Sequence, residues 1–224
     1  LQRRSQPENK GDLRKDFRNP PAETPNTEFE KCVQEIRNVL VSAKGNTEEE
    51  RTQYNEMLNR AVLGFREERE KMIALINDIL VKRRITDVLP ANSKYGTLAE
   101  AVFAEIIGLN VLELILKDKD GLEEIQVVGR RIYEVRKGKV VPSPYRFRSV
   151  KEVERIQQNL VLFNNETINP RKKWAEVSLS DGSRVTLTGF GLTSEPTLTI
   201  RFFSSEFYDF DALCREGVET MNDE

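Results

Sequence analysis

The apolar residues of this chain change their spacing near residue 120, and that change constrains the fold more than any other feature. Before this point they recur every three or four residues, as on one face of a helix, for example Phe29, Val33, Ile36 and Leu40. After it, apolar and polar residues alternate, as they do along a half-buried strand. The sequence therefore predicts an α+β fold, in which a helical hairpin or bundle precedes a small sheet domain with a helix on one face.

Threonines followed three residues later by glutamate predict where the helices begin. Thr27, Thr47 and Thr97 all have this capping-box spacing, in which the hydroxyl and the carboxylate each bond an amide of the first turn. Gly45 separates the first helix from the second, which we expect to run unbroken to about residue 84. Two helices joined by a short turn should pack antiparallel as a hairpin.

The second half of the chain predicts two groups of strands with a helix between them. The turn at Asp181 and Gly182 is expected to be a three-residue loop that places Leu179 opposite Val185, because this register buries both side chains. The predicted strands lie at 124–128, 131–135, 140–141, 175–180, 184–187 and 198–202, and the predicted helix at 150–163.

Composition excludes several classes of enzyme. The chain has no histidine, which removes Ser-His-Asp and Cys-His nucleophile systems and most zinc sites. It also lacks the glycine-rich loops that hold nucleotide phosphates, and no pair of carboxylates stands out. Cys32 and Cys214 are far apart in sequence and indicate free thiols in a reducing compartment, although a disulfide between them stays open.

Charge is divided into two opposed blocks. Residues 129–173 hold 12 Lys or Arg against 4 Asp or Glu, whereas residues 174–224 hold 3 against 10. The basic block could meet anionic lipid or nucleic acid, and its aromatic neighbours suit base stacking. We favour a solvated sheet edge, which basic side chains protect from further pairing. The members of this basic block are Arg130, Arg131, Arg136, Lys137, Lys139, Arg146 and Arg148, and the aromatic neighbours are Tyr133, Tyr145 and Phe147.

A third hypothesis joins the two blocks. The basic block of one subunit could meet the acidic block of the next, and such a contact would orient a head-to-tail ring. No apolar run approaches the roughly 18 residues that a membrane span needs.

Five motifs in the same order resemble the N-terminal domain of type II/IV secretion ATPases, most of all the tight-adherence (Flp) pilus assembly branch. The resemblance covers about residues 100–215. It departs from the family pattern at Asn110-Val111, where the family has Gly-Pro, at Val128, where it has asparagine, at Phe202, where it has lysine, and at 171–174, where it has proline and aspartate. The motifs are residues 106–118 with 122–129, 132–139, 179–185 (LSDGSRV), 197–201 (TLTIR) and 209–213 (DFDAL).

The resemblance implies the N-terminal regulatory and oligomerisation region of a hexameric motor that powers pilus assembly or protein secretion at the cytoplasmic face of a membrane. It implies that Arg184 and Arg201 contact the phosphates of a nucleotide, with ATP and Mg²⁺ held mainly by a catalytic domain that lies downstream of this chain. It further implies a PAS-like sheet domain, a homo-oligomeric ring and an inner-membrane platform protein as partner, with an anionic membrane surface as a further option.

The predicted organisation follows from these patterns. The expected parts are a disordered tail at 1–28, a helical bundle at 29–95, the secretion-ATPase-type domain at 96–205 and a linker at 206–224. Two alternatives stay open. One is a stand-alone adaptor of the same fold that never binds ATP, in which case both arginines simply face solvent on their strands. The other, which we favour less, is a nucleic-acid-binding module that uses the basic block.

Overall fold

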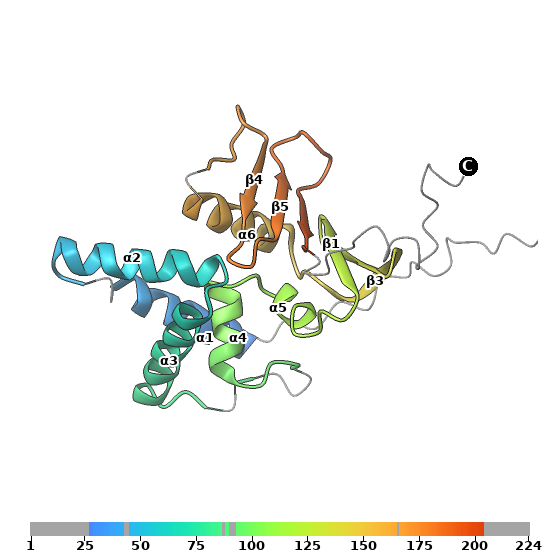
Figure 1. The fold of residues 1–224 in the computed structure, drawn as a ribbon. Coiled ribbons are helices and arrows are strands. Elements are labelled where there is room, and N and C mark those ends of the chain that lie inside the picture. Colours follow the sequence, from blue (N-terminus) through green and yellow to red (C-terminus); the bar gives the residue numbers. More distant parts are fainter. Residues whose placement is uncertain (1–26, 43–44, 87, 90–92, 165, 204–224) are drawn as a thin grey trace, which may run out of the picture.

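The computed structural model describes residues 27–42, 45–86, 88–89, 93–164 and 166–203. Within them the fold is α+β, as predicted. Helices α1 to α4 gather on one side and the sheet lies on the other, with the short α5 between them (Figure 1). The helices are α1 (Thr27–Ser42), α2 (Glu48–Val62), α3 (Arg66–Lys82), α4 (Leu98–Ile106), α5 (Leu112–Ile115) and α6 (Val150–Phe163).

Almost all of the predicted tail, the whole predicted linker and Cys214 lie outside the described residues, so the division into domains stays a prediction. The last two residues assigned to the tail already belong to α1. None of the helices in the described part of the chain combines the length and the apolar character needed to cross a lipid bilayer.

The sheet has six antiparallel strands in the order β3-β2-β1-β6-β5-β4. Two three-strand meanders lie side by side, and α6 carries the chain from one edge of the sheet to the other. The strands are β1 (Leu122–Val128), β2 (Arg131–Arg136), β3 (Lys139–Arg146), β4 (Trp174–Ser178), β5 (Arg184–Thr188) and β6 (Thr197–Arg201). All six were predicted, although β3 is longer than the two residues expected.

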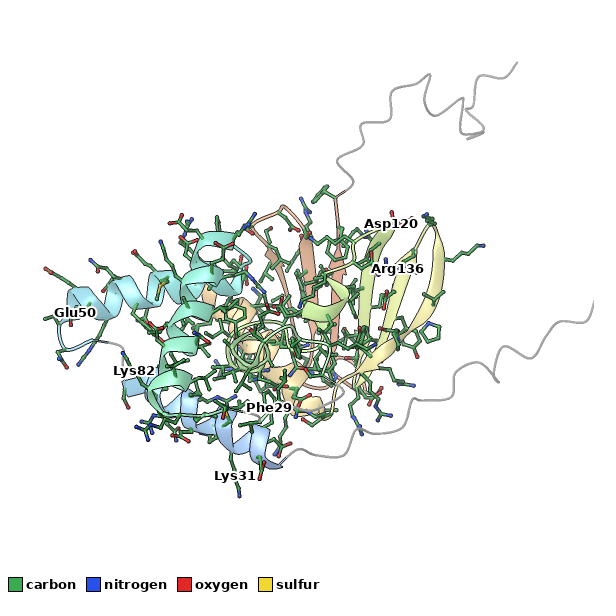
Figure 2. The ribbon with its side chains drawn as sticks, turned by 90° about the horizontal axis from the view of Figure 1, so that it is seen from below. Phe29, Lys31, Glu50, Lys82, Asp120 and Arg136 are labelled. Carbon is green, nitrogen blue, oxygen red and sulfur yellow. The ribbon has the colours of Figure 1, made fainter. Side chains whose placement is uncertain are left out.

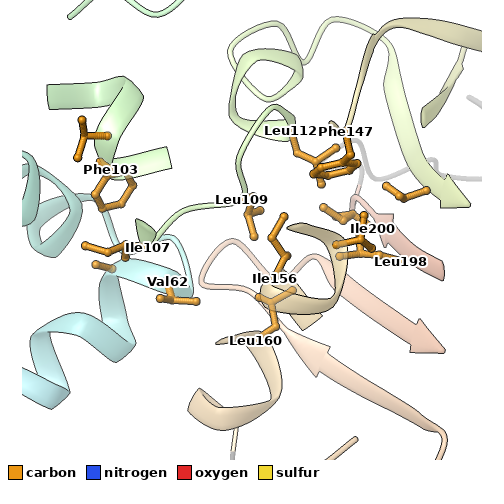
Figure 3. Close-up of a cluster of buried hydrophobic side chains, with 14 of the residues drawn as sticks. Val62, Phe103, Ile107, Leu109, Leu112, Phe147, Ile156, Leu160, Leu198 and Ile200 are labelled. Carbon is orange, nitrogen blue, oxygen red and sulfur yellow. The ribbon is translucent and has the colours of Figure 1, made fainter. Parts of the chain in front are cut away.

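One apolar core joins the helices to the sheet. Ile156 and Leu160 of α6 are fully buried over Leu198 and Ile200 of β6. The cluster continues through Leu109 to α2 and α4, as Figure 3 shows. Full burial of one such side chain contributes about 1.5–3 kcal/mol, so this shared core fixes the helical layer on the sheet.

The long second helix expected from the sequence is in fact two helices, which corrects the prediction. Gly64 adopts a positive φ of 97° and ends α2. The amide of Phe65 then bonds the oxygen of Arg60 at 3.0 Å and the amide of Gly64 bonds that of Ala61 at 3.2 Å, which is a Schellman ending. The apolar stripe continues through the corner, and this continuity hid the break.

The helices also pack differently from the predicted hairpin. α2 and α3 pack on each other, and α3 packs on α4, whereas α1 lies mainly against α4. The predicted cap at Thr47 is confirmed, since its hydroxyl accepts from the Glu50 amide at 3.1 Å and the Glu50 carboxylate accepts from the Thr47 amide at 3.2 Å. At Thr97 the hydroxyl behaves in the same way, but Glu100 bonds the amide of Gly96 instead.

The β4–β5 hairpin has a register two residues away from the predicted one. Val177, not Leu179, lies opposite Val185. The side chains still point to the expected faces, because a shift of two residues preserves the alternation of a strand. The connection is longer than predicted because Leu179 and Ser183 already belong to the turn, where the Leu179 amide bonds the Ser183 oxygen at 2.9 Å.

Candidate functional site

The two arginines predicted to contact phosphate lie next to each other on the exposed face of the sheet. Arg184 begins β5 and Arg201 ends β6, and they are directly opposite in the antiparallel register. Val185 and Ile200, their neighbours along the strands, are fully buried. The alternation of each strand therefore turns both guanidinium groups away from the core.

Each arginine has one carboxylate partner from a flanking strand. Arg201 donates from Nε to Glu124 Oε2 of β1 at 3.0 Å, and its Nη2 lies 2.9 Å from the same oxygen. Arg184 donates from Nη1 to Glu176 Oε1 of β4 at 3.3 Å. The side chains of Arg184 and Arg201 are 64% and 76% exposed, so a stronger anion can reach both guanidinium groups. The Arg184–Glu176 pair is a weak surface pair, whereas Glu124 is only 12% exposed.

The surroundings of this arginine pair are polar and open. Thr186 and Ser178 are exposed on the same face, and Glu124 also accepts a hydrogen bond from Gln126. The site therefore offers two adjacent guanidinium forks, each able to bind an oxyanion with two parallel hydrogen bonds. Sequence reasoning found the arginines but missed Glu124 and Glu176, which the alternation of β1 and β4 places on the same face.

The basic block is largely engaged within the chain. Arg131 pairs with Glu195 at 2.9 Å, and Arg130 Nε donates to the oxygen of Phe147 at 3.1 Å. Arg136 pairs with Glu134 at 2.8 Å and donates to the backbone oxygen of Asp120 at 2.7 Å, beside which it lies in Figure 2.

The strand that carries part of this block is an edge of the sheet. β3 has Lys139 at its start and Pro142 and Pro144 along it, which are the residues that discourage further strand pairing. Of the three aromatic neighbours, Phe147 is fully buried, and Lys94 Nζ lies 4.6 Å from the centroid of the Tyr145 ring. This geometry favours the sheet-edge interpretation over base stacking.

Arg148, the last member of the block, joins three helices. It pairs with Glu105 of α4 at 2.6 Å, with Glu152 of α6 at 2.9 Å and with Glu30 of α1 at 3.6 Å. Burial raises the pKa of Glu105, and the positive charge of Arg148 offsets this only in part. Arg148 is thus a structural residue that ties the helical layer to α6.

A cleft of about 440 Å³ opens between the helical layer and the sheet. Its floor is formed by the α2–α3 corner and α4, and its far wall by the tip of the β4–β5 hairpin. The Ser180 amide bonds the Leu63 oxygen at 2.8 Å and holds that tip on the corner. The apolar lining includes Leu63, Ile73, Leu109, Leu116, Leu179 and Phe202.

Four polar features complete the cleft. Arg69 of α3 pairs with Glu113, whose other oxygen accepts from the Leu109 amide at 2.9 Å. Tyr95 is half-buried in the lining, and Lys119 at the rim pairs with Asp181 at 2.9 Å. Lys117 pairs with Glu100 at 3.0 Å. No pattern in the sequence predicts this cleft, because its lining residues come from segments that are far apart in the chain, from Val62 to Phe202.

The remaining candidate residues are structural or lie outside the described residues. Cys32 is buried in the helical core, and burial, followed by the charge of Glu35, raises the pKa of its thiol. Within the part of the chain that the structure describes, no three cysteine or carboxylate side chains come close enough together to hold a metal ion.

No protein-family model matches the chain, and a search of the curated proteins finds no match. Among solved structures, the chain is similar to the crystal structure of the VirB11 ATPase from the Brucella suis type IV secretion system in complex with sulphate. The sequence identity is 15% and the TM-score is 0.41, over 47% of this chain and 33% of that one. The matched region thus spans about a third of the length of that ATPase.

Proposed function

We propose that this chain is an N-terminal regulatory and oligomerisation region of a motor ATPase of the type II/IV secretion family, in which Arg184 and Arg201 contact the phosphates of a bound nucleotide. The direct opposition of these two arginines on the exposed face of the sheet carries the proposal. Two of the five family motifs contain these arginines: LSDGSRV includes Arg184, and TLTIR ends with Arg201.

The physical argument rests on charge. Two like charges directly opposite in an antiparallel pair repel each other, so the arrangement costs stability unless anions lie beside it. Glu124 and Glu176 supply one carboxylate each. A triphosphate carries more charge and more acceptor oxygens than either carboxylate, and guanidinium groups stabilise the charge that develops in phosphoryl transfer.

The proposed catalytic domain would supply what this chain does not carry. It would hold ATP and Mg²⁺ through a GxxxxGK[ST] loop, because the present sequence contains none. Within that family we propose the tight-adherence pilus branch, which the order and spacing of the sequence motifs support. Its partners would be further copies of itself in a hexameric ring and a platform protein of the inner membrane.

The basic and acidic blocks support an oriented ring. Among the described residues, Arg130 has one side-chain hydrogen bond, from Nε, and its charge can therefore meet the acidic block of a neighbouring subunit. Reversal of this charge in Arg130→Glu should weaken ring assembly and reduce its dependence on salt. Assembly that is unchanged in both respects would contradict the contact.

The decisive experiment measures ATP turnover by the longer protein with Arg184→Ala and Arg201→Ala, each alone. Turnover should fall by about 10³-fold or more in each variant, as it does when a phosphate-contacting arginine is removed. Arg66→Ala is the control, since Arg66 of α3 is also an exposed arginine with one carboxylate partner and lies outside the basic block. Its turnover should be unchanged.

The alternative is an adaptor of the same fold that does not meet ATP. It gains support if the coding sequence does not continue into a phosphate loop, or if the longer protein neither binds nor hydrolyses ATP. Full turnover in both arginine variants would instead contradict the phosphate role of Arg184 and Arg201. A nucleic-acid-binding module would instead show strong, salt-dependent binding to an oligonucleotide, and Arg130→Glu would weaken it.

A further inference from the structure

Arg69, which lines the cleft between the helices and the sheet, has few partners for its degree of burial. Its side chain is 23% exposed and pairs with one carboxylate, Glu113. Its guanidinium carbon also lies 4.8 Å from the centroid of the Phe103 ring. The described residues provide no second acceptor for its remaining N–H groups.

Arg148 provides a comparison within the same chain. Its side chain is 31% exposed, close to the value for Arg69, yet three carboxylates surround it. A guanidinium group has five N–H donors, and no nitrogen of Arg69 is among the fully buried unpaired atoms of the described residues, so its donors without an acceptor stay accessible from the cleft. The environment of Arg69 is therefore incomplete on the side that faces the cleft.

Tyr95 adds a second donor to the lining. Its backbone amide bonds the Ser93 hydroxyl at 3.2 Å, but its own hydroxyl has no partner among the described residues. This oxygen is not among the fully buried unpaired atoms of the described residues, so a ligand in the cleft can reach it. Burial raises the pKa of Tyr95, as do the nearby Glu105 and Glu113, so the phenol keeps its proton at neutral pH and can donate.

We infer that the cleft binds an amphipathic anion, a molecule with an apolar body and a single carboxylate or phosphate head. The head accepts hydrogen bonds from Arg69 and Tyr95, and the body lies along the apolar lining. The volume of about 440 Å³ is within the range of small-molecule sites, and the mixture of apolar walls with a few polar groups is typical of them.

The charges around the cleft agree with a head that carries little charge. Lys117 and Lys119 at the rim already pair with Glu100 and Asp181, so neither offers a free charge. Selection therefore comes from the unmatched donors and not from a general positive field. A highly charged ligand such as a triphosphate fits this site less well than the open arginine pair.

Such a ligand would bridge elements that are far apart in sequence. The lining includes Gly64 at the α2–α3 corner, Ser180 at the hairpin tip and Phe202, which directly follows Arg201. Binding would hold the helical layer on the sheet. The inference goes beyond the proposed motor function and does not depend on it, because the ligand binds to this chain alone.

Calorimetric titration of the chain tests the inference, with dodecanoate and dodecyl phosphate below their micelle concentrations and dodecanol below its solubility limit. At least one of the two anions should bind at a single site, and dodecanol should bind about tenfold more weakly or not at all, which is the loss expected without a charge-assisted hydrogen bond. The tighter of the two anions identifies the head group. Equal binding of dodecanol, or no binding of either anion, overturns the inference.

Variants locate the site. Arg69→Met should weaken binding of the anion by about tenfold or more. Tyr95→Phe removes only one oxygen and should weaken it roughly threefold to tenfold, so it serves as the test if Arg69→Met does not fold. Arg66→Met is the matched control, because Arg66 lies one turn away on α3 with its side chain 92% exposed. Unchanged binding in Tyr95→Phe and in a folded Arg69→Met, or an equal loss in Arg66→Met, overturns the assignment.

Discussion

Arg184 and Arg201 are directly opposite each other across β5 and β6, and each takes its carboxylate partner from the strand on its far side. Across four strands the charges thus run from Glu124 through the two arginines to Glu176. The acidic residues at the ends relieve the repulsion in the middle. A ligand with several phosphate oxygens would also relieve the repulsion between the two arginines, if it bound on the exposed face of the sheet.

Removal of the Glu124 carboxylate, which pairs with Arg201, should strengthen phosphate binding. Glu124→Gln keeps the shape of the side chain but frees the guanidinium group from a partner that is only 12% exposed. We expect the affinity of this chain for inorganic tripolyphosphate at low salt to rise about twofold to fivefold, a change on the scale of one surface charge pair. Titration calorimetry measures this directly.

Glu176→Gln is the companion variant at the other end of this row of four charged residues. Its contact with Arg184 is longer, at 3.3 Å, and both partners are well exposed. Its effect should therefore be smaller than that of Glu124→Gln. If neither variant changes the affinity, or if both lower it, the arginine pair is not where the phosphate binds.

The outward direction of the two arginines could be predicted from sequence, but their opposition could not. Alternation with Val185 and Ile200 is a local property, which the strand period of two determines. The opposition belongs to the pairing of β5 with β6. The register of the neighbouring β4–β5 hairpin depends on distant contacts, above all the bond from the Ser180 amide to the Leu63 oxygen. The predicted register was therefore two residues away, although every side chain still had its predicted face.

The same limit explains the missed corner between α2 and α3. Tyr54, Met57, Phe65 and Met72 have spacings that suit a single helix, so the pattern continues through the break. Only Gly64 marked it, and a glycine inside a helical pattern is compatible with either interpretation. The cleft depends on this corner, and for that reason the sequence could not reveal it.

Gly64→Ala should lower the free energy of unfolding by about 1–2 kcal/mol, because an L-residue is strained at the positive φ of Gly64. The new Cβ would also lie 3.1 Å from Ser180 Oγ at the hairpin tip. Gly138→Ala is the control: Gly138 has a φ of 70°, and nothing lies within 4 Å of its added Cβ. Urea denaturation should show a larger loss of unfolding free energy for Gly64→Ala than for Gly138→Ala. Equal losses would mean that the contact between the added Cβ and the hairpin tip does not affect stability.

Glu105 should make stability depend on pH in a direction opposite to that of most carboxylates. Burial raises its folded pKa above the ordinary value of 4.5, against the charge of Arg148. The folded state therefore binds the proton more tightly than the unfolded state. The stability that this proton contributes is complete below pH 4.5 and is lost as the pH rises through the folded pKa.

Glu105→Gln tests that direction, because it removes the titration but keeps a hydrogen-bonding side chain. The difference in unfolding free energy between variant and wild type should move in favour of the variant between pH 4.5 and pH 8, as measured by urea denaturation at several pH values. Other carboxylates cancel in this difference. A shift in favour of the wild type would mean that the ion pair with Arg148 outweighs burial.

Arg148→Met should be the most destabilising single change among those considered. It leaves Glu105 and Glu152 without their cation, and both side chains are at most 15% exposed. Loss of one partner from such a buried group costs about 3 kcal/mol. Arg66→Met, which removes an equally large but exposed arginine from α3, should leave the unfolding midpoint almost unchanged.

Because Arg148 also meets Glu30 of α1 at 3.6 Å, amide hydrogen exchange in Arg148→Met should rise in α1 before it rises in the sheet. Exchange that rises equally in both would mean that the cluster stabilises the whole core and does not specifically hold α1.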